Sequence, residues 1–171
     1  MSKDRVEAAR NSYYVLTREE VTFFECFSSF IVPSGSDPKT EPGAREVGTV
    51  RYIDSHLYEF PKEVQDYFRD TVRMIEDLSG RLFAKPFRDL NDPDRNIVFR
   101  KMYLDPKSRE RALDIRSLAL EGFYSDYHDP WYEGLSGWEV VGFSGKRISD
   151  LKKDWTFLKV WKDWSEHDSS K

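Results

Sequence analysis

The feature that most constrains this chain is a pattern of apolar residues at three- and four-residue spacing, introduced by a helix start signal. The first signal is a capping box at residues 17–20, where Thr17 accepts from the third helical amide and Glu20 bonds back to the cap. The apolar positions behind it are Val21, Phe24, Phe27 and Ile31, and Val32-Pro33 ends the run. Such spacing predicts a helix that buries one face.

Similar signals predict four more helices. A second helix is expected over residues 44–58, with Tyr58 on its apolar side, and a third begins at Pro61, which suits a first helical turn. Asp92-Pro93 and Asp105-Pro106 each place a cap residue before proline, and so predict the starts of a fourth and a fifth helix. The fifth helix is expected to close near Gly122. No segment alternates long enough to predict a strand, so we expect an all-α bundle of about five helices.

The organisation of the chain fits one domain, residues 1–171, because domains average ~150 residues. The parts we expect are an N-terminal arm (1–15), the helical bundle (16–122), an irregular segment (123–147), a C-terminal helix (148–164) and a frayed tail (165–171). Segment 123–147 is rich in both aromatic residues and glycine, which indicates an irregular layer packed on the bundle or at an interface.

The expected C-terminal helix carries apolar residues on two sides. At ~100° per residue they form two stripes, Ile148, Leu151, Trp155 and Leu158 on one side and Phe157, Val160 and Trp164 on the other. A helix that packs on its own core needs one stripe. The second stripe therefore predicts a contact with another protein.

Composition excludes several functional classes. A net charge of −4 opposes binding to nucleic acid, which depends on clustered positive charge. No segment approaches the ~20 apolar residues that cross a bilayer. The single cysteine, Cys26, excludes an internal disulfide, and its place in an apolar helix predicts core packing. The chain shows no signal-peptide run and no adjacent arginine pair, so we expect a soluble, cytoplasmic protein unless a partner exports it.

Catalytic, cofactor-binding and metal-binding patterns are missing from the sequence. The glycines late in the chain lack the register of a phosphate-binding loop. His128 lies between Asp126 and Asp129, but this spacing matches no recognised metal pattern, and a hydrogen-bonded loop histidine is the simpler interpretation. His56, one turn after Tyr52, is expected at the surface or its boundary.

Short motifs between about Leu16 and Gly145 follow one another in a characteristic order. They are Leu16-Thr17-x-x-Glu20, Ile31-Val32-Pro33, Pro42-Gly43-Ala44-Arg45, Tyr52-Ile53-Asp54, Gly122-Phe123-Tyr124-Ser125, Tyr132-x-Gly134, Trp138 and Phe143-x-Gly145. In order and spacing they resemble the gluconate 2-dehydrogenase subunit 3 family. Two features depart from that pattern: there is no twin-arginine leader, and the glycine-rich stretch is reduced to Glu133-Gly134-Leu135.

The resemblance implies a small, non-catalytic subunit of a multi-subunit dehydrogenase. The large partner in that family is a flavoprotein of the glucose–methanol–choline class, which oxidises sugars or sugar acids. FAD and the catalytic residues are therefore expected in the partner, and no cofactor in this chain. The small subunit is thought to help its partner mature and, with a twin-arginine signal, to carry it through the membrane. An electron-transfer subunit is a further partner that such a complex can contain.

Aromatic residues are enriched in interface cores, so those of the last third are our candidate contacts with the flavoprotein. These candidates are Trp131, Tyr132, Trp138, Trp155, Trp161 and Trp164. For Trp138 and Trp155, packing within the chain is an equally good interpretation.

Two other functional classes stay open at this point. One is a stand-alone binding protein that holds a small ligand, such as a sugar, between Trp131 and Trp138. The other is a helical metalloenzyme that uses the loop of Asp126, His128 and Asp129.

Overall fold

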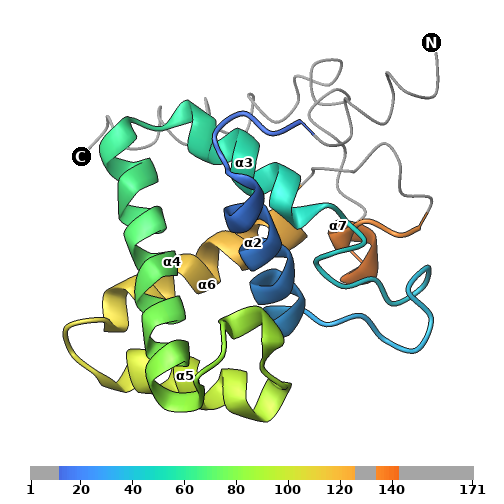
Figure 1. Ribbon diagram of the computed structural model, residues 1–171. Coiled ribbons are helices and arrows are strands. Elements are labelled where there is room, and N and C mark those ends of the chain that lie inside the picture. Colours follow the sequence, from blue (N-terminus) through green and yellow to red (C-terminus); the bar gives the residue numbers. More distant parts are fainter. Residues whose placement is uncertain (1–11, 126–133, 143–171) are drawn as a thin grey trace, which may run out of the picture.

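Helices make up most of the chain that the structure describes, and they pack together as a bundle (Figure 1). The computed structural model describes residues 12–125 and 134–142. Its elements are α2 (Arg18–Ile31), α3 (Thr49–Glu59), α4 (Lys62–Phe83), the 3₁₀ turn η1 (Phe87–Asp89), α5 (Asp92–Leu104), α6 (Arg109–Tyr124) and α7 (Gly137–Val140). These residues contain no strand, and the expected all-α bundle is confirmed.

Helix α2 packs against α3, α4, α6 and η1. It begins as the sequence indicated, since the Thr17 hydroxyl accepts from the Glu20 amide at 3.2 Å and the Glu20 carboxylate accepts from the Thr17 amide at 2.8 Å. It ends at Ile31, with Val32 as its C-cap, as Val32-Pro33 predicted.

The core between α2, η1 and α5 is built from phenylalanine rings. Phe27 is 0% exposed, and its ring centroid lies 5.6 Å from that of Phe23, 6.0 Å from that of Phe87 and 5.8 Å from that of Phe99. Such ring pairs add ~0.5–1.5 kcal/mol each beyond the burial of their area. We call Phe23, Phe24, Phe27, Phe30, Phe87 and Phe99 the phenylalanine core.

The second helix starts later than expected. Residues 44–48 form turns, and α3 begins at Thr49, whose amide donates to the Ala44 carbonyl at 3.0 Å. The reason is Gly48, which takes the left-handed conformation with φ 79°. Glycine adopts this conformation without steric cost, and it interrupts a right-handed helix.

The two Asp-Pro pairs also act differently from the prediction. The cap of α5 is Asn91, whose side chain accepts from the Asp94 amide at 2.9 Å, so Asp92 is already the first helical residue. Asp105-Pro106 opens a turn, because the Asp105 carbonyl accepts from two amides there and α6 begins only at Arg109. At α5 the neighbouring Asn91 therefore decided the boundary, and at α6 the turn after Asp105 delayed it.

We expected α6 to end near Gly122, but it continues to Tyr124. Gly122 instead allows α6 to pack closely against α3, because a Cβ atom at this position would lie 2.8 Å from Cγ2 of Thr49. Segment 123–147 was expected to be irregular, and the described part of it contains the four-residue helix α7 with a capping box at Ser136. The division into arm, bundle, layer and tail stays a prediction, and residues 148–171 lie outside the described part.

Candidate interaction surface

A buried carboxylate on α3 holds the segment that precedes α2. Asp54 is 3% exposed and accepts backbone N–H groups from Tyr14 at 2.6 Å, from Val15 at 3.0 Å and from Leu16 at 3.0 Å. These charge-assisted bonds compensate the carboxylate for its removal from water. We call residues 12–17 the N-terminal strap. Asp54 ends the Tyr52-Ile53-Asp54 motif noted in the sequence, and within the fold its carboxylate binds the N-terminal strap.

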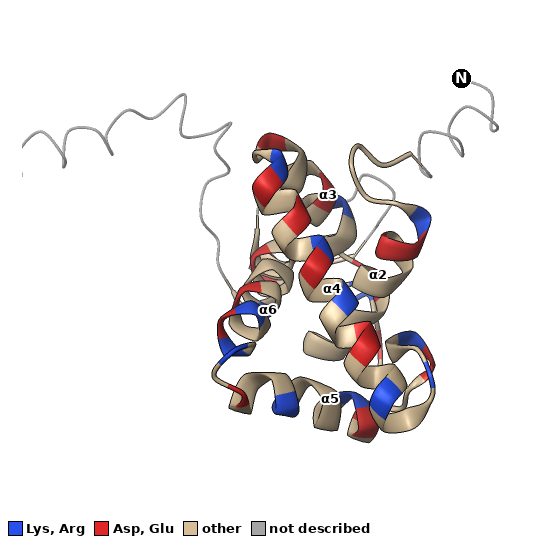
Figure 2. Cartoon of the chain, turned by 60° about the vertical axis from the view of Figure 1, so that its left-hand side comes forward, with Lys and Arg blue, Asp and Glu red and all other residues tan. Residues whose placement is uncertain are grey.

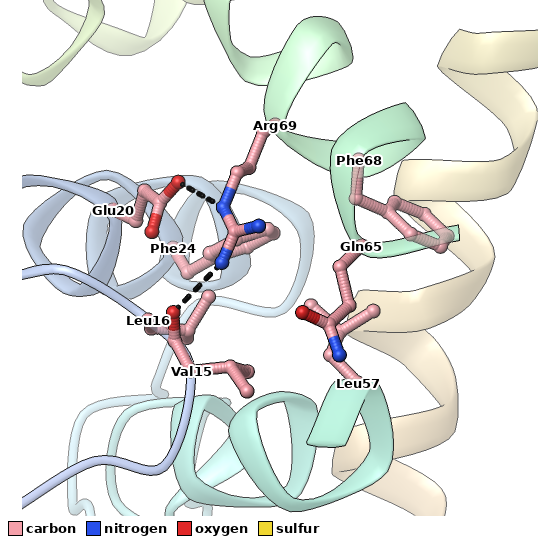
Figure 3. A pocket seen from close by; sticks show the side chains of 8 residues that line it. All are labelled: Val15, Leu16, Glu20, Phe24, Leu57, Gln65, Phe68 and Arg69. Atoms are coloured by element: carbon pink, nitrogen blue, oxygen red, sulfur yellow. Dashed lines mark hydrogen bonds and ion pairs between the residues drawn. The ribbon is translucent and has the colours of Figure 1, made fainter. Parts of the chain in front are cut away.

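An arginine on α4 holds the same strap from the other side. The Arg69 guanidinium donates to the Val15 carbonyl at 2.9 Å and to Glu20 at 3.1 Å (Figure 3). It also donates to Asp66 at 3.0 Å. Hydrogen bonds from Lys62 and Arg69 lower the pKa of Asp66. Strap, α2 and α4 are therefore tied together at one side chain.

The hollow beside Arg69 in Figure 3 is nearly filled. Its enclosed volume is about 10 Å³, between the strap, α2, α3 and α4. A space of ~10–15 Å³ holds at most one water molecule. The charged side chains here join segments of the fold, and they leave no room for a substrate.

The strap places an aromatic ring on the surface. Tyr14 packs on Tyr58 of α3 with 5.1 Å between ring centroids, and the two residues are 72% and 60% exposed. The Arg51 guanidinium lies over the ring of the neighbouring Tyr13, with its Cζ atom 5.4 Å from the ring centroid. The Tyr14–Tyr58 pair thus joins two segments that are far apart in the sequence.

A second row of rings runs along α3 at four-residue spacing. The His56 ring stacks on Tyr52 at 5.2 Å and meets Phe60 edge-on at 4.8 Å. Phe60 is 39% exposed. At ~100° per residue, Ser55 and Glu59 point outward between this row and Tyr58. We call this surface the outer face of α3; it consists of Tyr14, Tyr52, Ser55, His56, Tyr58, Glu59 and Phe60.

Carboxylates border the outer face of α3. Burial raises the pKa of Tyr52, and the nearby carboxylates of Glu121 on α6 and Glu59 on α3 raise it further. Both glutamates are exposed, and neither forms a hydrogen bond or ion pair within the described residues. On α4, by contrast, acidic and basic residues are interspersed (Figure 2), and Lys62 pairs with Asp66 at 2.9 Å.

A polar cluster between α4 and α6 fixes those helices. The Tyr67 hydroxyl donates to Asp114 at 2.6 Å, and Arg111 lies 4.3 Å from the Tyr67 ring centroid while donating to Thr71 at 3.1 Å. Burial, followed by the bond to Asp114, raises the pKa of Tyr67 to about 12. A tyrosine that holds its proton so firmly is suited to a structural hydrogen bond.

Among the sequence-predicted contacts, Trp138 on α7 is the one that the structure describes. Its side chain is half-buried, and its indole N–H donates to the Tyr124 carbonyl at the end of α6. Packing within the chain therefore accounts for part of its surface, and a contact with a partner stays a prediction. The remaining candidates lie outside the described residues, namely Trp131, Tyr132, Trp155, Trp161, Trp164 and the loop of Asp126, His128 and Asp129.

Two further expectations are met. Cys26 is half-buried against the phenylalanine core, and burial raises the pKa of its thiol. His56 is partly buried, at the boundary between core and surface.

Within the described ranges no group of three or more His, Cys, Asp or Glu side chains is placed to hold a metal ion. No helix there is long and apolar enough to cross a membrane.

Sequence reasoning missed the exposed aromatic residues of the outer face. The helical pattern put Tyr58 on the buried side of its helix, and this was wrong, because Tyr58 is 60% exposed. The available signal was its place directly after Leu57, which is 2% exposed, since neighbouring residues lie ~100° apart on a helix. No local signal indicated that Tyr14 would meet Tyr58.

The fold places this chain among all-α helical bundle proteins. Its sequence matches the family model described as Gluconate 2-dehydrogenase subunit 3 over residues 18–145, which is most of the chain. The chain therefore belongs to the gluconate 2-dehydrogenase subunit 3 family, as the order of its motifs indicated. No curated protein and no solved structure matches it. The family name denotes one subunit of a dehydrogenase complex, so a dehydrogenase partner is implied.

Proposed function

We propose that this chain is the non-catalytic accessory subunit of a flavin-dependent sugar or sugar-acid dehydrogenase of the glucose–methanol–choline class. It binds the large subunit and stabilises it or helps it mature. FAD, substrate and the catalytic residues belong to that partner, and an electron-transfer subunit is a further component that such a complex can contain. Family membership supports a role within a dehydrogenase complex. The observation that carries the binding role is the outer face of α3, where exposed aromatic rings are held in fixed positions.

The chemistry of the described polar groups fits an accessory role. Asp54 and Arg69 bind the strap, and Tyr67 joins α4 to α6 through Asp114. Each of these groups is engaged in holding its own chain together. Aromatic side chains that remain exposed are the residue types that anchor protein interfaces.

A pull-down from native cells tests this proposal. Tagged chain should recover a large partner in fixed stoichiometry, and the eluate should show the absorption spectrum of a bound flavin. A colourless eluate without a large partner would contradict the accessory role.

Co-expression tests the maturation step. The large subunit, produced with and without this chain, should gain soluble yield or flavin content when the chain is present. Equal yield and equal flavin content in both cultures would leave a stable subunit contact without a maturation role.

A further inference from the structure

We infer that the outer face of α3 is the surface on which the large flavoprotein subunit docks, and that it meets an apolar hollow bordered by lysine or arginine side chains. The inference rests on the proposed function for the identity of the partner. What it adds is the location of the contact on this chain and the chemistry of the complementary surface.

The tyrosine rings of the outer face are exposed but held in place. Tyr14 is 72% exposed and Tyr58 60%, yet each ring is restrained by the other at 5.1 Å. A restrained aromatic side chain loses little conformational freedom when a partner covers it, and it offers a large contact area. Leu104, on α5, is similarly exposed at 64% but has an aliphatic side chain, so it serves as a comparison site.

The aromatic rings of the outer face are bordered by carboxylates. Glu59 lies on the outer face and Glu121 beside it, both exposed and both without a hydrogen bond or ion pair within the described residues. A cationic border on the partner would complement them, and such pairs raise the rate of association and select the partner. A second copy of this chain is disfavoured here, because a two-fold contact would bring the same carboxylates together.

The strap makes this surface depend on Asp54. Tyr14 belongs to the strap, and its amide is held by Asp54 at 2.6 Å. Asp54 is therefore a positioning residue: it contacts no partner, but it keeps Tyr14 against Tyr58.

The test compares three pairs of substitutions in the full chain, co-expressed with the large subunit that the wild-type chain recovers. The aromatic pair is Tyr14→Ser with Tyr58→Ser, the charge pair is Glu59→Gln with Glu121→Gln, and the control pair is Ile97→Ser with Leu104→Ser on α5. The aromatic pair should weaken the dissociation constant about 10- to 100-fold, as loss of interface anchors does. The charge pair should cause a smaller loss and remove most of the salt dependence. The control pair should bind like the wild type.

The outcomes separate this inference from the proposed function. If the wild-type chain recovers no flavoprotein, the proposed function fails. If the wild type and the aromatic pair bind the flavoprotein equally, the docking surface is wrong while the accessory role stands. If the aromatic pair instead lowers the mass of the free chain in light scattering from that of a dimer to that of a monomer, the surface belongs to a second copy of this chain, and the inference is overturned.

A second measurement keeps the test decisive if the aromatic pair fails to fold. A photo-crosslinking residue, p-benzoylphenylalanine, is placed at Tyr58 or at Leu104, one position at a time. Crosslinking to the large subunit from position 58 and not from position 104 supports the inference. The reverse pattern overturns it.

Discussion

Two groups of aromatic residues in this molecule have opposite environments. The phenylalanine core between α2, η1 and α5 buries rings such as Phe24 and Phe27, which are 2% and 0% exposed. The outer face of α3 carries rings that stack in pairs and rows, and it leaves Tyr14 and Tyr58 mostly in solvent. Ring contacts occur in both places, but only the phenylalanine core contains rings that are almost completely buried.

The comparison shows how residue type divides between stability and recognition. The core uses phenylalanine, which has no polar atom that would need a partner when buried. The outer face uses mainly tyrosine and histidine, whose rings offer apolar area while their polar atoms stay solvated or accept new bonds. Substitutions in the core should therefore change the free energy of unfolding, and substitutions on the outer face should change association.

The largest expected effect comes from Phe27→Ala. The substitution removes a fully buried ring that contacts several others, and such changes cost about 3–5 kcal/mol of unfolding free energy. Urea unfolding followed by circular dichroism measures it. Tyr58→Ala is the matched variant on the outer face, and it should cost less than about 1 kcal/mol. Equal losses for the two variants would break the distinction between the groups.

Asp54→Asn should give the next largest effect. The carboxylate accepts three backbone N–H groups, and hydrogen bonds to charged groups contribute about 1.5–3 kcal/mol each, so a loss of about 2–3 kcal/mol is expected for the neutral side chain. Hydrogen exchange should show faster exchange at residues 14–16 and little change in α5. Asp70→Asn, at an exposed ion pair with Arg73, is the control and should be nearly neutral.

Gly122→Ala tests the support of the outer face. The new Cβ would meet Thr49 of α3 at 2.8 Å, and overpacking of this kind costs about 1–3 kcal/mol. Gly80→Ala on α4 is the matched control, because a Cβ there meets nothing within 4 Å. Replacing a glycine inside a helix should stabilise by about 0.5–1 kcal/mol. Thermal melting would contradict this account if both variants shifted the midpoint in the same direction.

The smallest expected effect comes from Tyr67→Phe. Loss of the bond to Asp114 should cost about 1 kcal/mol at neutral pH. Since the folded pKa of Tyr67 is about 12, above the unfolded value near 10, its contribution is complete below pH ~10 and is lost as the pH rises toward 12. The wild type should therefore lose more stability than the variant across that interval. Denaturant titrations at stepped alkaline pH measure the difference, and parallel curves would contradict the assignment.

Much of the fold could be predicted from the sequence because its signals are local. The capping box at Thr17 and the end of α2 before Pro33 involve residues within one helical turn. Boundaries failed where a neighbour competed with the expected signal: Asn91 capped α5 in place of Asp92, and Gly48 delayed α3. Local rules give a helix its type more reliably than its first residue.

The sequence by itself determined the helical class, the acidic charge and, through the order of its motifs, the family. The surface was decided by the tertiary structure. Asp54 finds its partners 38 to 40 residues away, and the Tyr14–Tyr58 pair spans a similar separation. Helical periodicity tells which residues share a side of one helix, but only the packing of the strap, α3 and α6 decides which sides stay exposed. The physical reason is that burial depends on neighbours that only the folded chain brings together.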